Sequence, residues 1–201
     1  LYTRFETSYD RFQPNVDSTY RMGVVPLDVP ADPIYFAAPM LAQRVAKAQP
    51  EVEDLLALFP FAPGGRAELE MRVRIDDSVF ALPGHYSATK NLLDFVKLDV
   101  LYGDLSQALA TRGQIALSRS DAIRLFGTDN AVGRTFADAG GPASWNVAAV
   151  FADLPADTHY DFKSLSTAEG LPDRFAGFTY VRTRPGTDLT TLAARIGEEV
   201  T

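Results

Sequence analysis

Two histidines, His85 and His159, are the side chains in this sequence best suited to acid–base or metal chemistry. His159 lies between Asp157 and Asp161, and a neighbouring carboxylate can orient an imidazole for proton transfer. A loop histidine can instead hold a turn through hydrogen bonds, and we favour this structural interpretation. The two histidines are 74 residues apart, and neither belongs to an HxxxH or HExxH pattern, so the sequence predicts no metal site.

Common catalytic and nucleotide-binding motifs are absent from the sequence. It contains no GxSxG, GxxxxGK[ST] or GxGxxG pattern, and its Gly pairs at 64–65 and 140–141 stand beside prolines or in turn-like contexts. The acidic pairs Glu51/Glu53 and Asp76/Asp77 are typical of solvated turns rather than of glycosidase sites. With no cysteine, disulfides and thiol catalysis are excluded. We therefore predict a non-catalytic domain with no cofactor and no metal.

Length and charge limit the class of protein further. The 201 residues carry a formal net charge of -7, with 46% hydrophobic and 22% charged residues, which favours a globular chain and argues against a nucleic-acid partner. The longest mostly apolar run, Leu55 to Ala62, is far shorter than the roughly 18 residues of a membrane span. Because the chain begins at Leu1 without a targeting sequence, we expect a segment of a longer protein.

Periodicity predicts the elements that position these residues. In the first 75 residues we expect a helix at 1–12 ended by Pro14, strands at 18–27, 54–61 and 67–75, and a helix at 36–48 ended by Pro50.

The second half of the sequence carries clear local signals as well. Ser118 and Asp121 predict a helix N-terminus, and Gly127 predicts its left-handed end. We expect Trp145 to pack a strand at 144–151, and we expect a further strand at 177–183 and a helix at 189–196. The order β-α-β, an inserted middle third, then β-α favours two outer units that share a sheet.

Five stretches also resemble a known family, in the order that the family shows. SYDRFQPNVDSTYRM (8–22) is similar to the ELSYDRFHPNADRIYRV-type segment that follows the first transmembrane helix in permeases of the MacB/FtsX class of ABC transporters. Ala131 stands where this family usually has proline, and Asp157-Thr158 stands where it has Asn-Ser. The other four stretches are QPEVED (49–54), LLDFVKLDVLYGDLSQAL (92–109), IALSRSDAIRLFGTDNAVGRTF (115–136) and WNVAAVFADLPADTHYDF (145–162).

The resemblance implies an α+β fold, with a porter-like βαβ/βα lobe and an inserted smaller β-rich lobe of the Sabre type. Residues 1–17 would end a membrane stalk helix, 18–75 and 176–201 would form the porter-like lobe, and 76–175 the inserted lobe. The stalk would join the domain at Tyr9, Asp10, Phe12 and Tyr20. A turn between the lobes would contain Asp153, Pro155, Asp157 and His159, held by local hydrogen bonds.

The resemblance also implies a function and its partners. Such a domain lies at the periplasmic face of the inner membrane and couples cytoplasmic ATP hydrolysis to export or mechanical work. Its partners would be an ABC ATPase subunit and the membrane helices of the full-length permease, with a periplasmic adaptor as a further candidate. We expect the isolated domain to be a monomer and the full-length protein a dimer. A ligand-sensing extracytoplasmic module and a secreted enzyme with its site at Asp157, His159 and Asp161 are the alternatives.

Overall fold

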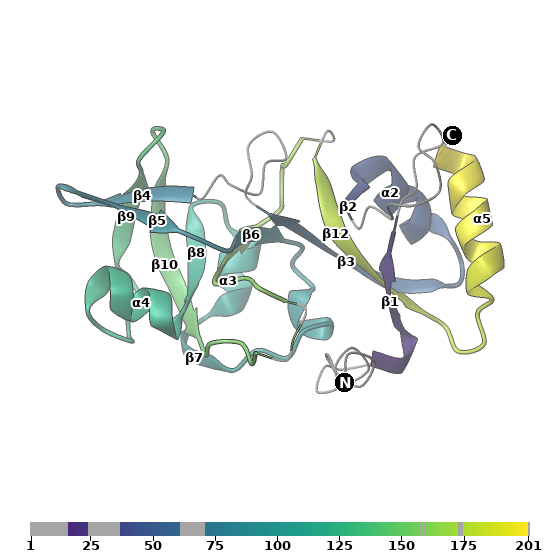
Figure 1. Cartoon of the computed structure of the whole chain (residues 1–201), viewed down its shortest axis with the longest axis horizontal. Helices are drawn as coiled ribbons and strands as arrows, with labels where there is room; N and C mark the ends of the chain where they lie inside the picture. Colours follow the sequence, from purple (N-terminus) through teal and green to yellow (C-terminus); the bar gives the residue numbers. More distant parts are fainter. Residues whose placement is uncertain are drawn as a thin grey trace.

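The computed structural model describes residues 16–23, 37–60, 71–156, 158, 160–172 and 175–200. These residues form one sheet of twelve strands with helices on its faces, in an elongated molecule (Figure 1). The class is α+β and the sheet is mostly antiparallel, which confirms the fold class expected from the sequence.

The helices and strands of the described residues have the following bounds. The helices are η1 (Val16–Ser18), α2 (Met40–Ala48), η3 (Leu92–Asp94), α3 (Leu105–Ala110), α4 (Arg119–Phe126) and α5 (Leu189–Val200), of which η1 and η3 are 3-10 turns. The strands are β1 (Thr19–Met22), β2 (Ala37–Pro39), β3 (Val52–Pro60), β4 (Met71–Ile75), β5 (Ser78–Leu82), β6 (His85–Ala88), β7 (Val100–Gly103), β8 (Gln114–Ser118), β9 (Thr135–Asp138), β10 (Ser144–Phe151), β11 (Ser164–Thr167) and β12 (Ala176–Thr183).

Strand order connects the two ends of the molecule. The sheet runs β1-β12-β3-β6-β11-β8-β10-β9-β4-β5, with β2 paired to β12 and β7 paired to β10. The pairs β6 with β11 and β8 with β10 are parallel, and the other pairs are antiparallel. Because β12 returns from the end of the chain to lie between β1 and β3, the outer units share a sheet, as expected from the sequence.

The strands of the middle segment extend that same sheet. β4 pairs with β5 and β9, at the end of the molecule opposite β1 (Figure 1). The division into lobes at residues 18–75, 76–175 and 176–201 stays a prediction, and the hydrogen-bonded strands run without a break across its boundaries.

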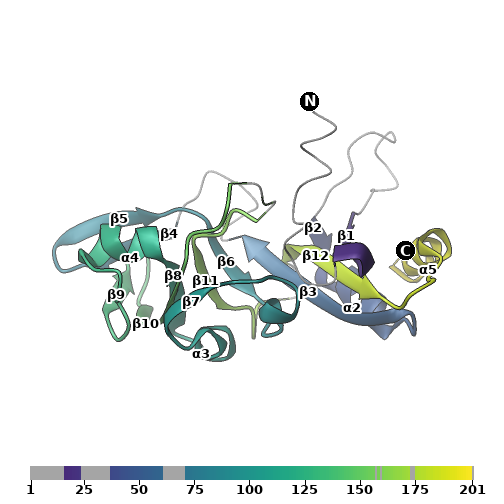
Figure 2. The same cartoon turned by 90° about the horizontal axis from the view of Figure 1, so that it is seen from below.

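Helices cover both faces of the sheet. Figure 2 shows α3 and α4 on opposite sides of the strands at one end, while α2 and α5 lie together at the other. Three buried clusters fill the interfaces: Leu105 and Leu109 of α3 belong to the central one, Ala122 and Leu125 of α4 to the second, and Leu192 of α5 to the third. Each fully buried leucine contributes about 1.5 to 3 kcal/mol relative to exposure.

Local sequence signals determine the ends of α4. The Ser118 hydroxyl accepts a hydrogen bond from the Asp121 backbone N–H, and Gly127 has a φ of 69°, as predicted. The Asp121 carboxylate makes no return bond to Ser118; it pairs with Arg124 at 2.7 Å, and the Ser118 N–H donates to the Lys163 carbonyl instead. The Lys163 carbonyl, from a distant segment, therefore takes the place of the Asp121 side chain as the acceptor for the Ser118 N–H.

Other boundaries differ slightly from those expected. The strand expected at 54–61 begins at Val52 and ends at Pro60, because pairing with β12 continues to Thr183. α2 ends before Pro50, with Gln49 in the extended conformation (ψ 135°), which confirms the predicted stop. The helix expected at 1–12 and part of the strand expected at 18–27 lie outside the described residues.

Candidate functional site

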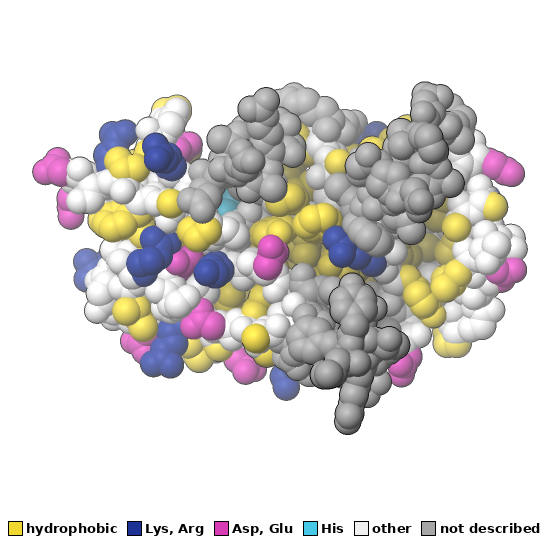
Figure 3. Space-filling view, in the orientation of Figure 1, with side chains coloured by type: hydrophobic (Ala, Val, Ile, Leu, Met, Phe, Trp, Pro, Cys, Tyr) yellow, Lys and Arg dark blue, Asp and Glu magenta, His cyan; other side chains and the backbone are white. Residues whose placement is uncertain are grey.

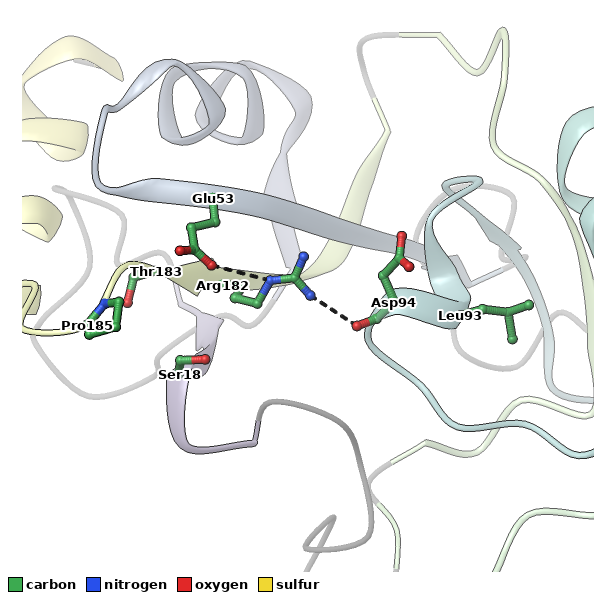
Figure 4. Close-up of a pocket in the computed structure, with 7 residues that line it drawn as sticks. All are labelled: Ser18, Glu53, Leu93, Asp94, Arg182, Thr183 and Pro185. Carbon is green, nitrogen blue, oxygen red and sulfur yellow. Dashed lines mark hydrogen bonds and ion pairs between the residues drawn. The ribbon is translucent and has the colours of Figure 1, made fainter.

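A surface pocket of about 700 Å³ lies where β12 and β3 meet the turn around η3. Figure 4 shows Arg182 between Glu53 and Asp94 in this pocket. Ser18, just before β1, lies on the same pocket, so the site adjoins the place where the described chain enters the sheet. Its lining residues are Ser18, Glu53, Leu93, Asp94, Arg182, Thr183 and Pro185.

Arg182 occupies a central place in this site because β12 has strands on both sides. Its backbone is the register partner of Thr19 in β1 and of Asp54 in β3. The Arg182 side chain is only 19% exposed. A cation that is mostly buried in a sheet requires compensating partners, since unpaired burial of a charge is costly.

Four groups compensate the Arg182 guanidinium. Its Nη1 donates to the Asp94 carbonyl oxygen at 3.1 Å, and the guanidinium lies over the Phe95 ring, 4.9 Å from the centroid. Its Nε is 3.7 Å from Glu53 Oε2, and its Nη2 is 3.7 Å from Asp54 Oδ2. The two ion pairs are long, so the hydrogen bond and the ring contact determine the position of the guanidinium.

Asp54 extends the network to a helix and a turn. Its carboxylate accepts from Lys47 Nζ of α2 at 3.3 Å, from Asn91 Nδ2 at 2.8 Å and from the Leu55 N–H at 2.8 Å. Burial acts to raise the pKa of Asp54, but these donors outweigh it and lower the pKa below its usual value. The carboxylate therefore stays ionised at neutral pH and links β3, α2 and the turn that leads into η3.

Chemically, this arrangement cross-links elements through ion pairs and hydrogen bonds. None of the described residues form a group of three or more His, Asp or Glu side chains placed to hold a metal ion. Within the described part of the chain, no helix is both long and apolar enough to span a bilayer. The network joins β12 and β3 to the segment that continues into β7.

Of the residues expected at the stalk junction, the structure describes Tyr20. Tyr20 in β1 is 40% exposed, and its hydroxyl donates to the Asp17 carbonyl at 3.2 Å. Tyr9, Asp10 and Phe12 lie outside the described residues. Tyr20 is the register partner of Val181, so it belongs to the neighbourhood of Arg182.

The expected inter-lobe turn is described only in part. Asp153 Oδ1 accepts from the Ser120 hydroxyl at 2.6 Å and from the Ser120 N–H at 3.3 Å, so it binds the first turn of α4. Pro155 is exposed, and Asp157 and His159 lie outside the described residues. Tyr160, at the far end of the turn, packs against Tyr180 of β12 with 5.2 Å between the ring centroids, so the chain that leaves β10 reaches back to β12. The inter-lobe role of the turn stays a prediction.

Sequence reasoning missed the Arg182 network. One signal pointed to it: an arginine interrupts an apolar run in a strand, and such a charge requires a partner. The partners themselves, Asp54 and Asp94, are far away in the sequence and could not be identified from it.

His85 forms a second buried polar cluster, which the sequence did not predict. Its ring is 4% exposed and lies between two hydroxyls, with Nδ1 2.9 Å from Ser164 Oγ and Nε2 3.2 Å from Ser166 Oγ. Trp145 packs edge-on at 5.9 Å between ring centroids, consistent with the packing role expected for it. Burial lowers the pKa of His85 to about 4, so the ring is neutral at physiological pH. The cluster joins the parallel strands β6 and β11.

Comparison with known proteins reveals a likeness in structure without a significant match in sequence. No family model matches the chain, and no curated protein sequence matches it significantly. A domain of a Porphyromonas gingivalis protein assigned as a permease superimposes with a TM-score of 0.70 at 19% identity, over 90% of this chain and 81% of that one.

Two further structures extend the likeness. The periplasmic region of MacB from Actinobacillus actinomycetemcomitans gives a TM-score of 0.61 at 10% identity, over 92% of this chain and 83% of that one. The extracellular domain of the ABC-type transporter YknZ from Gram-positive bacteria gives a TM-score of 0.62 at 16% identity, over 89% of this chain and 91% of that one. The chain has the fold of the extracytoplasmic domains of MacB-type permeases. This MacB-like fold agrees with the resemblance that the sequence motifs indicated.

Proposed function

We propose that this chain is the extracytoplasmic domain of an ABC transporter permease, and that it transmits motion from the membrane without catalysing a reaction. The observation that carries this proposal is the MacB-like fold over about nine-tenths of the chain in three separate comparisons. ATP hydrolysis would take place in a separate subunit or domain. The chain would couple that hydrolysis to export or to mechanical work at the periplasmic face of the inner membrane.

The Arg182 network supports a mechanical path through the domain. A stalk before β1 would pull first on β1, whose described residues pair with β12. Arg182, opposite Thr19, would pass that displacement to the turn around η3 through the Asp94 carbonyl and the Phe95 ring. A bistable hinge requires two discrete arrangements of such contacts, and in each of them Arg182 would need compensating partners.

The proposed partners follow from this arrangement. They are an ABC ATPase subunit, the membrane helices of the full-length permease and a periplasmic adaptor, with the full-length protein a dimer and the isolated domain a monomer. On the face in Figure 3, Lys and Arg side chains are interspersed with acidic ones, and the net charge of -7 further disfavours a nucleic-acid partner.

A ligand-sensing module of the same topology is the second candidate, and the pocket beside Arg182 favours it. The pocket has the volume of a small-molecule site, yet its Arg182 guanidinium already contacts Glu53 and the Asp94 carbonyl. A ligand would have to displace these contacts, so we rank transmission of motion above sensing.

Site-directed labelling tests the proposed location. The chain has no cysteine, so Glu169→Cys at an exposed turn supplies one known thiol in a full-length protein whose remaining segments have had any cysteines replaced. We expect a membrane-impermeant maleimide to label this thiol in spheroplasts as fully as in lysed membranes. The buried control Ala149→Cys should stay unlabelled in both. Labelling of Glu169→Cys only after lysis would place the domain in the cytoplasm and end the proposal.

A second experiment tests the coupling. Arg182→Gln in the full-length permease, bound to its ATPase, should leave basal ATP hydrolysis near wild type and reduce transport or transport-dependent growth several-fold. Arg184→Gln is the matched control, because Arg184 follows on the same chain but is exposed. If a folded Arg182→Gln protein transports as well as wild type, the path through Arg182 is wrong, whereas the permease assignment is unaffected.

A further inference from the structure

The β4–β5 hairpin at one end of the sheet has a free edge. β5 is the last strand in the order, and among the described residues it pairs only with β4 (Figure 1). A two-residue turn, Asp76-Asp77, joins the strands, so Ile75 and Ser78 form a hydrogen-bonded pair. Ser78, Phe80 and Leu82 therefore direct their backbone groups to β4. The backbone N–H and C=O groups of Val79 and Ala81 point away from the sheet.

The side chains of β5 do not protect this edge. Natural edge strands usually carry lysine, proline or a bulge that prevents another strand from pairing. The residues Ser78 to Leu82 are uncharged, contain no proline and pair with β4 without a bulge. Val79 is 54% exposed, more than any other large hydrophobic side chain that the structure describes. β5 is thus suited to accept an added strand.

The charge next to this edge indicates what kind of strand would bind. Arg72 and Arg74 are register partners of Ala81 and Val79, so their side chains share a face with these two residues. The opposite face, with Met71 and Val73, belongs to the buried cluster that α4 covers. Both arginines are exposed, and neither forms an ion pair with a described residue; Arg74 only donates to the Ala139 carbonyl at 3.4 Å.

This basic face is unusual in a chain of net charge -7. Figure 3 shows Lys and Arg side chains interspersed with acidic ones on the half of the molecule that carries β4, β5 and α4. Asp76 and Asp77 lie in the turn next to β5. Their negative charges would repel an acidic segment that extended past the strand, so the bound part of the partner would be no longer than β5. Two adjacent arginines within reach of an added strand favour glutamate or aspartate on its facing side.

We propose that the free edge of β5 binds, by strand addition, an extended segment of another protein that carries acidic side chains on the face of Arg72 and Arg74. Backbone hydrogen bonds to Val79 and Ala81 would supply affinity, and the arginines would supply selectivity. A second copy of this chain is the less favoured occupant. Two copies would bring together two chains of net charge -7 over only five residues of strand, far less area than a stable dimer needs.

Peptide binding to the full chain tests this proposal. The probe is a short fluorescent peptide in which glutamate alternates with valine, and its matched control replaces each glutamate with lysine. We expect the glutamate peptide to bind with a dissociation constant on the order of 10 to 100 μM, weakening as salt rises, and the lysine peptide to bind at least tenfold more weakly. Equal binding of the two peptides, or no binding of either, would overturn the proposal.

Two variants separate the backbone contribution from the charge contribution. Ala81→Pro removes one outward N–H and leaves the hydrogen bonds to β4 in place, so it should weaken the binding of the glutamate peptide at least tenfold. The control Ala81→Thr keeps this N–H and should leave the binding unchanged. The double variant Arg72→Glu with Arg74→Glu should reverse the preference toward the lysine peptide, and it keeps the test decisive if the proline variant fails to fold. Wild-type affinity in either folded variant contradicts the proposal. A dimer in light scattering that Ala81→Pro abolishes would assign the edge to a second copy instead.

Discussion

Asp54 and Arg182 are joined twice: they are register partners in β3 and β12, and their side chains form an ion pair with 3.7 Å between Oδ2 and Nη2. Cross-strand neighbours of opposite charge stabilise a sheet modestly. Here the pair also ties to β3 a guanidinium whose position is determined by the Asp94 carbonyl and the Phe95 ring. The stability of this contact can therefore be measured separately from any transport function.

Replacing Arg182 should destabilise the isolated chain. Arg182→Gln removes the donor to the Asp94 carbonyl and the stacking on Phe95, so we expect a loss of about 1 to 2 kcal/mol in the free energy of unfolding. Urea denaturation measures this loss. The exposed control Arg184→Gln should change the free energy by no more than about 0.5 kcal/mol. Equal effects of the two variants would show that the Arg182 contacts contribute nothing.

The burial of His85 predicts that the stability of the folded protein depends on pH. Its pKa is lowered from 6.5 to about 4 in the folded state, so the unfolded chain binds a proton between these values and the folded chain does not. The contribution of His85 to the free energy of unfolding is therefore at its full value above pH 6.5. It falls by up to about 3 kcal/mol as the pH drops toward 4. Below pH 4 both states are protonated, and no further loss arises from this group.

The variant His85→Gln isolates this effect, because the carboxylates titrate alike in both proteins. We expect the free energy of unfolding of wild type minus that of the variant to shrink by about 3 kcal/mol between pH 7 and pH 4. Chemical denaturation at several pH values gives the difference. A difference that stays constant with pH would mean that His85 has the same pKa in the folded and the unfolded protein, as a solvated ring would.

Asp153 should stabilise the start of α4. Asp153→Ala removes the acceptor for the Ser120 N–H and hydroxyl, and we expect a cost of about 1 kcal/mol. Asp153→Asn keeps an acceptor oxygen, so it should retain most of that stability. Thermal unfolding followed by circular dichroism distinguishes them. If both variants melt together and well below wild type, the negative charge matters more than the hydrogen bonds.

Two glycines with positive φ should respond differently to alanine. Gly127 has a φ of 69° with open space around it, so Gly127→Ala should cost about 1 kcal/mol from backbone strain alone. Gly103 has a φ of 77°, and a Cβ there would collide with the Ala148 carbonyl of β10. Gly103→Ala should therefore cost at least about 2 kcal/mol more than Gly127→Ala in urea denaturation. Similar costs would mean that β7 can move away from β10.

Local features of this protein were determined by the sequence itself. The start and end of α4 follow from Ser118 and Gly127, because a capping hydroxyl and a left-handed glycine act within one helical turn. The alternation of β4 likewise predicted its buried face, since successive side chains in a strand point to opposite sides. These signals and the order of elements predicted two outer units that share a sheet, and the resemblance to MacB/FtsX-type permeases implied the α+β class.

Tertiary structure alone decided which residues meet. Arg182 contacts the Asp94 carbonyl from 88 residues away, and His85 binds Ser164 and Ser166 from 79 and 81 residues away. No periodicity encodes such separations, because strand order and register depend on how the whole chain buries its apolar surface. The same global pairing left β5 at the edge of the sheet with two arginines beside it, a position that the alternation within β4 could not reveal.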